Sequence, residues 1–275
     1  MPPTKPSSRT ASTADSLPPD PAGAGGLCAI HQPNFFPRLT TLAKLFAADC
    51  WIVLDDVQFT RRDYQHRTPL AALNDPTGRR WLSIATHLPH GRRTLVKNAV
   101  MAEPARSRQR TARMLHQYYG ASPFWPAFRQ SLGPVLDAFL TSNRTAAVAE
   151  ASTRTLLDLL GWRGEIVHSS GLPARPGRSQ RLVDLAAAVD ARTYLCGRGG
   201  MRYLDADPFT TNGISVTPFT IPETGVWKTA HDTSSLWALM RIGPQRLTSD
   251  LHTHRLALGD HRDGLDRQPA ATVRP

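Results

Sequence analysis

Short apolar runs alternate with amphipathic segments along this chain, and this order is the feature that most constrains its fold. LCAI at 27–30 and CWIVLD at 50–55 have the length and composition of buried strands, and LTTLAKLFAAD between them places Leu42 and Leu45 on one face of a helix. Further along, EIVHS predicts a strand, RLVDLAAAVDA a helix and TYLCG another strand. Two such β-α-β units predict an α/β fold, with a mainly parallel sheet and helices on both faces.

A helical region separates the two units. Helical periodicity is present at 106–119, 131–140 and 145–160, and Gly161 follows as a natural end of the last helix. We therefore predict that residues 104–160 form a mainly helical insertion in the middle of the α/β domain.

The predicted folded domain spans residues 27–250, with a further short strand at 81–85. Residues 1–26 are rich in Pro, Ser, Thr, Ala and Gly and have few side chains to bury, so they predict a disordered leader. Residues 251–275 mix Arg and Asp with scattered Leu and end in Pro, which predicts a flexible tail.

The composition is typical of a cytoplasmic protein with a basic surface. The 275 residues include 33 Lys and Arg against 22 Asp and Glu, a net charge of +11. The arginines are dispersed, which favours solvated helix faces over a nucleic-acid partner. No run approaches the roughly 18 to 20 apolar residues of a membrane span. The three cysteines lack CxxC spacing, so neither a metal site nor a disulfide framework is expected.

Polar residues directly follow three of the predicted strands. Because the carboxyl ends of parallel strands meet at one edge of a sheet, where ligands bind, these residues form the candidate site. The candidates are His31, Gln32 and Asn34 after the first strand, Asp55, Asp56, Gln58 and Arg67 after the second, and Gly197, Gly200, Tyr203 and Asp205 after the last.

His31, Asp55 and Asp56 are the candidate catalytic residues. Imidazole titrates near neutral pH, so His31 can act as a general base or acid, can donate to a phosphate, or can simply bond to loop backbone. Carboxylates at a strand end can serve as base, acid or Mg²⁺ ligand. Adjacent strand residues point to opposite faces, so we expect only one of Asp55 and Asp56 to enter a site and the other to be structural.

The other candidates suit substrate binding. The amides of Gln32 and Asn34 can orient a substrate or satisfy the backbone of a turn. The Arg67 guanidinium matches a carboxylate or phosphate through two parallel hydrogen bonds. Gly197 and Gly200 permit close approach of a ligand, and a tight turn explains them equally well.

Three blocks together resemble the WbqC-like protein family in order and spacing: HQPNFFP (31–37), LDDVQFTRRDYQHR (54–67) and CGRGGMRYLD (196–205). The resemblance implies transfer of a small acyl or aminoacyl group, such as glycyl, onto an amino sugar or related amine in polysaccharide or natural-product biosynthesis. It also implies that the matching positions, including Tyr203 and Asp205, contribute to the site. The residues that depart from the family pattern are Arg38, Tyr64, His66 and Cys196, and they put substrate preference rather than fold in question.

Several functions stay open on the sequence. The expected transferase would bind an anionic small-molecule donor and an amine acceptor, with His31 as the base. An ATP-using ligase or nucleotidyltransferase would need Mg²⁺ at the Asp pair and a phosphate cradle. A non-catalytic nucleotide-sugar-binding accessory protein would use the same crevice without turnover.

Overall fold

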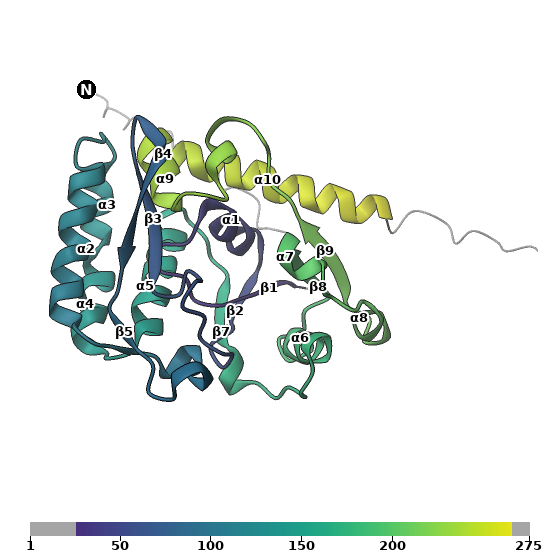
Figure 1. The fold of residues 1–275 in the computed structure, drawn as a ribbon. Coiled ribbons are helices and arrows are strands. Elements are labelled where there is room, and N and C mark those ends of the chain that lie inside the picture. Colours follow the sequence, from purple (N-terminus) through teal and green to yellow (C-terminus); the bar gives the residue numbers. More distant parts are fainter. Residues whose placement is uncertain (1–25, 266–275) are drawn as a thin grey trace, which may run out of the picture.

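A five-stranded parallel sheet lies at the centre of the fold (Figure 1). The structure is a computed structural model that describes residues 26–265. The strand order across the sheet is β7-β2-β1-β8-β9, and all neighbours run parallel. The strands are β1 (Leu27–His31), β2 (Cys50–Val53), β7 (Glu165–His168), β8 (Thr193–Gly197) and β9 (Ser215–Phe219). The predicted α/β class with a mainly parallel sheet is therefore confirmed.

The chain changes direction across the sheet between β7 and β8. β1, β2 and β7 extend the sheet to one side and β8 and β9 extend it to the other, so β1 and β8 are neighbours at a topological switch point. Pairing between these two strands covers only Leu27 and Cys28 against Thr193 and Tyr194. The carboxyl halves of β1 and β8 are thus unpaired with each other at the place where open α/β sheets bind ligands.

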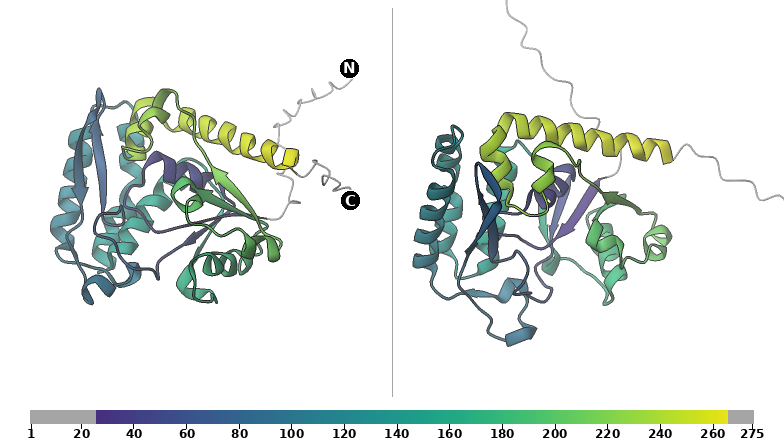
Figure 2. Two further views of the ribbon diagram at one scale, coloured as in Figure 1. Left: turned by 45° about the vertical axis from the view of Figure 1, so that its right-hand side comes forward. Right: turned by 45° about the horizontal axis from the view of Figure 1, so that its top comes forward.

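Helices cover both faces of the sheet, because alternate strand residues pack into different cores. The helices around the sheet are α1 (Leu39–Ala47), α6 (Arg178–Ala187), α7 (Arg198–Met201), α8 (Asp207–Thr211), α9 (Ser235–Ile242) and α10 (Pro244–Leu265). Ala29 and Trp51 belong to the core on the α1 side, whereas Ile30 and Ile52 belong to the core on the α6 side. Figure 2 shows α9 and α10 lying over α1, away from α6 and α8.

The predicted helical insertion forms a layer beside the sheet (Figure 1). It consists of α2 (Pro104–Tyr119), α3 (Trp125–Ser131), α4 (Gly133–Thr141) and α5 (Thr145–Leu159), and α2 packs against the hairpin of β3 (Arg67–Ala72) and β4 (Asp75–Ser83). Phe139 and Leu156 of this layer share one apolar core with Trp51 of β2. Continuous packing therefore joins the helical layer to the sheet.

Short elements connect these parts. β5 (Thr86–His87) pairs with β6 (Val100–Met101), and single 3₁₀ turns occur at η1 (Gly91–Arg93), η2 (Val96–Asn98), η3 (Ser169–Gly171) and η4 (Gly225–Thr229). Among the described residues, no helix is both long and apolar enough to cross a membrane.

Several strands differ from the sequence prediction, among them the β3–β4 hairpin and β9. The strand predicted at 81–85 overlaps only the last three residues of β4, the second strand of the β3–β4 hairpin. Its partner β3 has a weak strand pattern because Pro69 interrupts it. The sequence does not predict β9, whose apolar pattern is broken by Pro218. An edge position tolerates such a proline, and β9 is the edge of the sheet.

The ends of the chain also bear on the predicted boundaries. α10 continues to Leu265, past the predicted boundary at residue 250, and its early turns are anchored by the buried Leu247 and Leu251. The remaining part of the predicted tail and, apart from Gly26, the predicted leader lie outside the described residues.

Adjacent residues of α4 test the packing of the helical layer. Phe139 is 1% exposed and its ring meets the edge of Phe35 with centroids 6.4 Å apart, whereas Leu140 is 62% exposed. We expect Phe139→Ala to lower the free energy of unfolding by about 3–5 kcal/mol, because it leaves a cavity in the shared core. Leu140→Ala should change it by less than about 0.5 kcal/mol. Urea denaturation measures both, and equal losses would contradict this packing.

Candidate functional site

A cavity of about 690 Å³ opens at the carboxyl ends of β1, β2 and β8, on the α6 side of the sheet. Its volume lies within the usual range of small-molecule sites. Ile30, Leu54 and Tyr194 supply apolar surface. The polar groups that line it are Asp56, Gln58, Arg178, Arg181 and Tyr203. Apolar walls with a few converging polar groups are what a small organic ligand requires.

Asp56 and Arg181 form the charged centre of this cavity. Arg181 Nη2 of α6 donates to Asp56 Oδ2 at 2.5 Å, and Ser169 Oγ donates to Asp56 Oδ1 at 2.5 Å. Burial by itself would raise the pKa of the Asp56 carboxyl, but the hydrogen bonds from Ser169 and Arg181 outweigh it and hold the pKa below 3.8. Within the described part of the chain, buried Arg181 Nε has no partner, so the guanidinium keeps a donor for a ligand.

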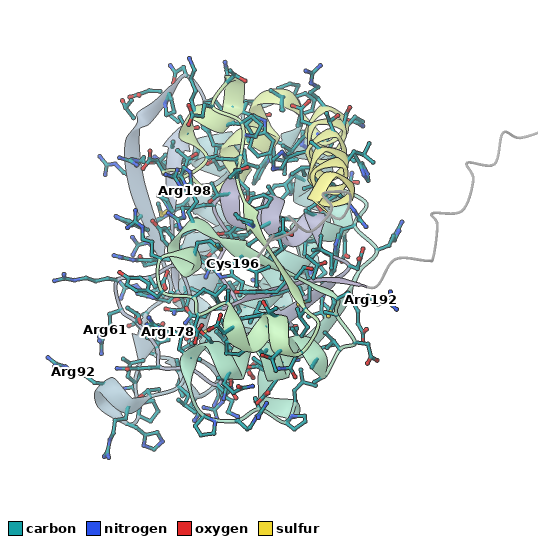
Figure 3. All side chains as sticks on the ribbon, turned by 90° about the vertical axis from the view of Figure 1, so that its right-hand side faces the viewer. Arg61, Arg92, Arg178, Arg192, Cys196 and Arg198 are labelled. Atoms are coloured by element: carbon teal, nitrogen blue, oxygen red, sulfur yellow. The ribbon has the colours of Figure 1, made fainter. Side chains whose placement is uncertain are left out.

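Arg178 and Tyr203 form the mouth of the cavity. The guanidinium carbon of Arg178 lies 5.1 Å from the centroid of the Tyr203 ring, and Tyr203 is 66% exposed. Gln58 Nε2 donates to the Arg92 carbonyl at 2.6 Å, which fixes that side of the opening. In Figure 3, Arg178 and Arg198 lie toward the carboxyl ends of the strands and Arg192 lies toward the opposite end.

Asp55, unlike Asp56, lies outside the cavity and is held by hydrogen bonds within the fold. Its buried carboxylate accepts hydrogen bonds from Ser169 Oγ at 3.1 Å, Ser170 N at 3.0 Å and Ser170 Oγ at 2.8 Å. These bonds tie the end of β2 to the turn η3 after β7. The two carboxylates therefore occupy different surroundings, and only Asp56 lines the cavity.

His31 lies on the other side of β1, facing α1. Its Nε2 is 3.3 Å from Thr41 Oγ1 of α1. Burial, and then the positive charges of Lys44 and Arg38, hold the pKa of His31 well below 6.5. The imidazole is therefore neutral at pH 7. Ile30, the preceding residue, lines the cavity, so the end of β1 separates His31 from it.

Lys44 is the one lysine buried among the described residues of this edge. It is 7% exposed, and its Nζ donates to the Ile30 carbonyl at 3.3 Å. Burial lowers the pKa of Lys44 to about 8, against an opposing influence of Cys196 and Cys28. Its side chain also reaches β8, because a Cβ added to Gly197 would lie 4.0 Å from Lys44 Cδ.

The turn after β1 is fixed by three separate elements. Phe36 has a φ of 42°, which a residue other than glycine adopts only under constraint. Its N–H donates to Ser152 Oγ of α5 at 2.8 Å, and its carbonyl accepts from Thr68 Oγ1 of β3 at 2.7 Å and from Ser234 Oγ at 3.1 Å. Helix α5, the hairpin and the start of α9 thus set the path from His31 to α1.

The glycines after β8 allow close packing. A Cβ at Gly200 would lie 2.7 Å from Cys196 Sγ, so only glycine lets the short helix α7 fold back against the end of β8. Cys196 is fully buried, and burial raises the pKa of its thiol. It is therefore placed as a small apolar residue, as the sequence favours.

The other predicted residues lie outside the cavity. Gln32 accepts from Gln65 Nε2 at 2.6 Å. Asn34 is buried, and its backbone carbonyl accepts a hydrogen bond from Thr153 Oγ1 at 2.9 Å. The Arg67 guanidinium stacks 4.2 Å from the Trp81 ring centroid and donates to backbone carbonyls. Asp205 Oδ1 accepts from Asp207 N at the start of α8.

Sequence reasoning missed Arg178, Arg181 and Lys44. Arg181 begins a predicted helix that follows a predicted strand, and Arg178 lies three residues before it, so their position at the carboxyl edge could have identified them. Lys44 is the single charged residue in LTTLAKLFA, where nearly every side chain is buried. A lysine inside a helix that is apolar on all sides was the available signal.

A second hollow, of about 1080 Å³, lies between β4 and α2. Its lining includes Arg79, Arg106 and Arg110 and none of the predicted site residues. It lies away from the strand ends, so the carboxyl edge of the sheet remains the candidate site.

The fold is that of an α/β protein whose parallel sheet has a cavity, the candidate site, at its switch point. The model of the WbqC-like protein family matches residues 32–236, and the chain belongs to this family. An uncharacterized protein of Mycobacterium tuberculosis is similar, with 23% identity over 198 residues, which is 70% of this chain and 80% of that protein. No solved structure matches the chain.

The Asp56–Arg181 pair predicts a specific pH dependence of stability. Asp56→Asn is expected to lower the free energy of unfolding at neutral pH, because it removes the charge that Arg181 faces. The folded-state pKa lies below the unfolded value of about 3.9, so the carboxylate stabilises the fold above that value and loses this effect as pH falls through the folded-state pKa. The difference in free energy of unfolding between the wild type and Asp56→Asn should therefore become smaller below about pH 4.

Urea denaturation at neutral and acidic pH measures this gap. Asp137→Asn, at an exposed position of α4, is the matched control and should equal the wild type throughout. If the difference in free energy of unfolding between the wild type and Asp56→Asn stays constant with pH, the ion pair does not contribute as expected.

Proposed function

We propose that this protein is a cytoplasmic transferase that moves a small acyl or aminoacyl group, such as glycyl, onto the amine of an amino sugar or related molecule. The observation that carries the proposal is the cavity at the strand ends, which combines the Asp56 carboxylate with the guanidinium groups of Arg178 and Arg181 beside apolar surface. Membership of the WbqC-like family supports it, since the family blocks contain Asp56 and Tyr203.

The cavity suits an acceptor that carries both an amine and an anionic group. Asp56 is ionised at neutral pH, and each of its oxygens, although it already accepts one hydrogen bond, keeps a second lone pair that can accept from an ammonium group. Arg178 and the free donor of Arg181 match a phosphate or carboxylate on the same molecule. An amino sugar joined to a nucleotide has this combination of charges.

The proposed reaction is attack of the acceptor nitrogen on the carbonyl carbon of the donor. A C–N bond forms, the bond from the carbonyl carbon to the leaving group breaks, and the electron pair departs with the leaving group. An ammonium nitrogen must release one proton before it can attack and a second as the C–N bond forms. The neutral His31 is the proposed acceptor of the first proton, and the second leaves with the departing group. Because the end of β1 separates His31 from the cavity, the substrates must meet over that strand end, where switch-point ligands lie.

A nucleotide-using ligase or nucleotidyltransferase is a second candidate, because this strand order is that of mononucleotide-binding sheets. Its Mg²⁺ would need free carboxylate oxygens, but Asp55 and Asp56 already accept from Ser169, Ser170 and Arg181. In the described part of the chain, no three His, Cys, Asp or Glu residues are grouped as metal ligands. The Asp pair is therefore a poor fit for the ion.

A ligand screen separates the candidates. Amino-sugar nucleotides, acyl thioesters, aminoacyl donors and ATP–Mg²⁺ are each added to the purified protein, and any ligand of the native state raises its melting temperature. Mass spectrometry of each donor–acceptor pair then detects an acylated amine. Stabilisation by ATP–Mg²⁺ alone would favour the ligase, and binding without product would favour a nucleotide-sugar-binding accessory protein.

The role of His31 gives a kinetic prediction. We expect His31→Gln to lower the rate of transfer by about 10²- to 10⁴-fold, which is the usual contribution of a positioned base. Because the pKa of His31 is lowered, the wild-type rate should fall only when pH drops well below 6.5. The matched control is His87→Gln, at an exposed position in β5. Product formation measures the rates, and an unaffected rate in His31→Gln would remove His31 from the reaction.

A further inference from the structure

Lys44 has no role in the cavity on the α6 side, yet its position requires an explanation. Burying an ammonium group is unfavourable unless an opposite charge or several acceptors compensate. The only acceptor within hydrogen-bonding distance among the described residues is the Ile30 carbonyl, at 3.3 Å, and no described carboxylate forms a salt bridge with Lys44. Two of its three N–H donors therefore remain available.

The position of Lys44 is set by the separation of β1 and β8. Leu54 N donates to the His31 carbonyl, so the backbone of His31 faces β2 and that of Ile30 faces β8. Because β1 and β8 are unpaired beyond Cys28 and Tyr194, the Ile30 carbonyl is open to the Lys44 ammonium. The lysine thus occupies the switch point between the two strand ends.

Other cations surround this point. Arg38 precedes α1, donates from Nη1 to the His231 carbonyl at 2.9 Å and stacks 4.1 Å from the Tyr64 ring centroid. In the described part of the chain, its buried Nε has no partner. His231 has a lowered pKa because of burial and then of Arg38 and Arg198, with Asp232 opposing. Asp232 itself is paired with Arg79 at 2.9 Å, so little negative charge compensates this group.

We propose that Lys44 and Arg38, next to His31, form a subsite for an oxyanion, a phosphate or a carboxylate, on the α1 side of the strand ends. The turn from β1 to α1 contains no glycine, so side chains rather than backbone N–H groups would hold the anion. The start of α1 has no acidic residue and no side-chain cap, so no negative side chain there competes with an anion, although Thr40 N already donates to the Ala230 carbonyl at 3.3 Å.

This inference deepens the proposed function. It rests on that function only for the identity of the anion, which we take to be part of the acyl donor. The acceptor would lie in the cavity on the α6 side and the donor on the α1 side, with His31 where they meet. Anion binding itself is measurable without any turnover. The protein can therefore prove to be a transferase that has no anion subsite here, or to bind an anion here without being a transferase.

Equilibrium binding of inorganic phosphate, pyrophosphate and acetate to the full-length protein tests the subsite by calorimetry. We expect Lys44→Met to weaken binding of the preferred anion about 10- to 100-fold, the effect of losing one charged hydrogen-bond donor. Arg192→Met removes one exposed positive charge at the amino end of β8, the opposite edge of the sheet, and should bind as the wild type does (Figure 3). Preference for phosphates or for acetate identifies the class of oxyanion.

The pH dependence distinguishes Lys44 from permanent charges. The groups around it are His31 and Cys28 of β1, Cys196 of β8 and Arg38. His31 is neutral above pH 7, and both thiols have raised pKa values, so Lys44 is the group that titrates near pH 8. Anion affinity should fall as pH rises through about 8 in the wild type, and Lys44→Arg, which stays charged, should retain affinity at higher pH.

Stability separates a binding role from a structural one. Removing a poorly compensated buried charge with Met, which fills similar space, should leave the melting temperature of Lys44→Met equal to or above that of the wild type at neutral pH. Anion affinity unchanged in Lys44→Met, or no binding of any of the three anions by the wild type, would overturn the proposal. If Lys44→Met does not fold, loss of the pH dependence in Lys44→Arg decides the same question.

Discussion

The separation of β1 from β8 is the constraint on which the candidate site depends. A parallel sheet whose chain changes direction must have two neighbouring strands whose following segments lead to opposite faces, and here these are β1 and β8. The turn after β1 leads to α1 and α7 follows β8, so the chain leaves the two strand ends in different directions. Lys44 reaches into that space from α1 and satisfies the Ile30 carbonyl, which β8 leaves unpaired.

The two sides of this edge have different chemistry. The α6 side has a carboxylate that is paired with arginine and lies beside apolar surface, whereas the α1 side has a neutral imidazole among cations. Asp55 fixes one edge of this arrangement, because its carboxylate joins the end of β2 to the turn after β7 through Ser169 and Ser170. Ser169 also donates to Asp56, so one serine positions the structural carboxylate and the one in the cavity.

Much of the fold was predictable from the sequence, because its central strands and helices bury continuous or periodic apolar runs. The weak elements were β3 and β9, whose prolines and polar residues are stabilised by tertiary pairing rather than by their own pattern. At the site, the order of polar residues after strands identified Asp56, Gln58, Gly200 and Tyr203, which line the cavity. That order alone did not identify the partners from α1 and α6, because these residues come from helices. Finding them required reading the start of the helix after β7 and the buried lysine of α1 as separate signals.

Phe36 links the stability of distant layers to the geometry of this edge. Its left-handed backbone is maintained by hydrogen bonds to α5, β3 and the start of α9, none of which belongs to the sheet. Loosening any one of them would allow the turn to relax to an ordinary conformation and would move α1 relative to β1. Local opening of the helical layer would therefore change the backbone that leads from His31 to α1, and with it the geometry of the candidate site.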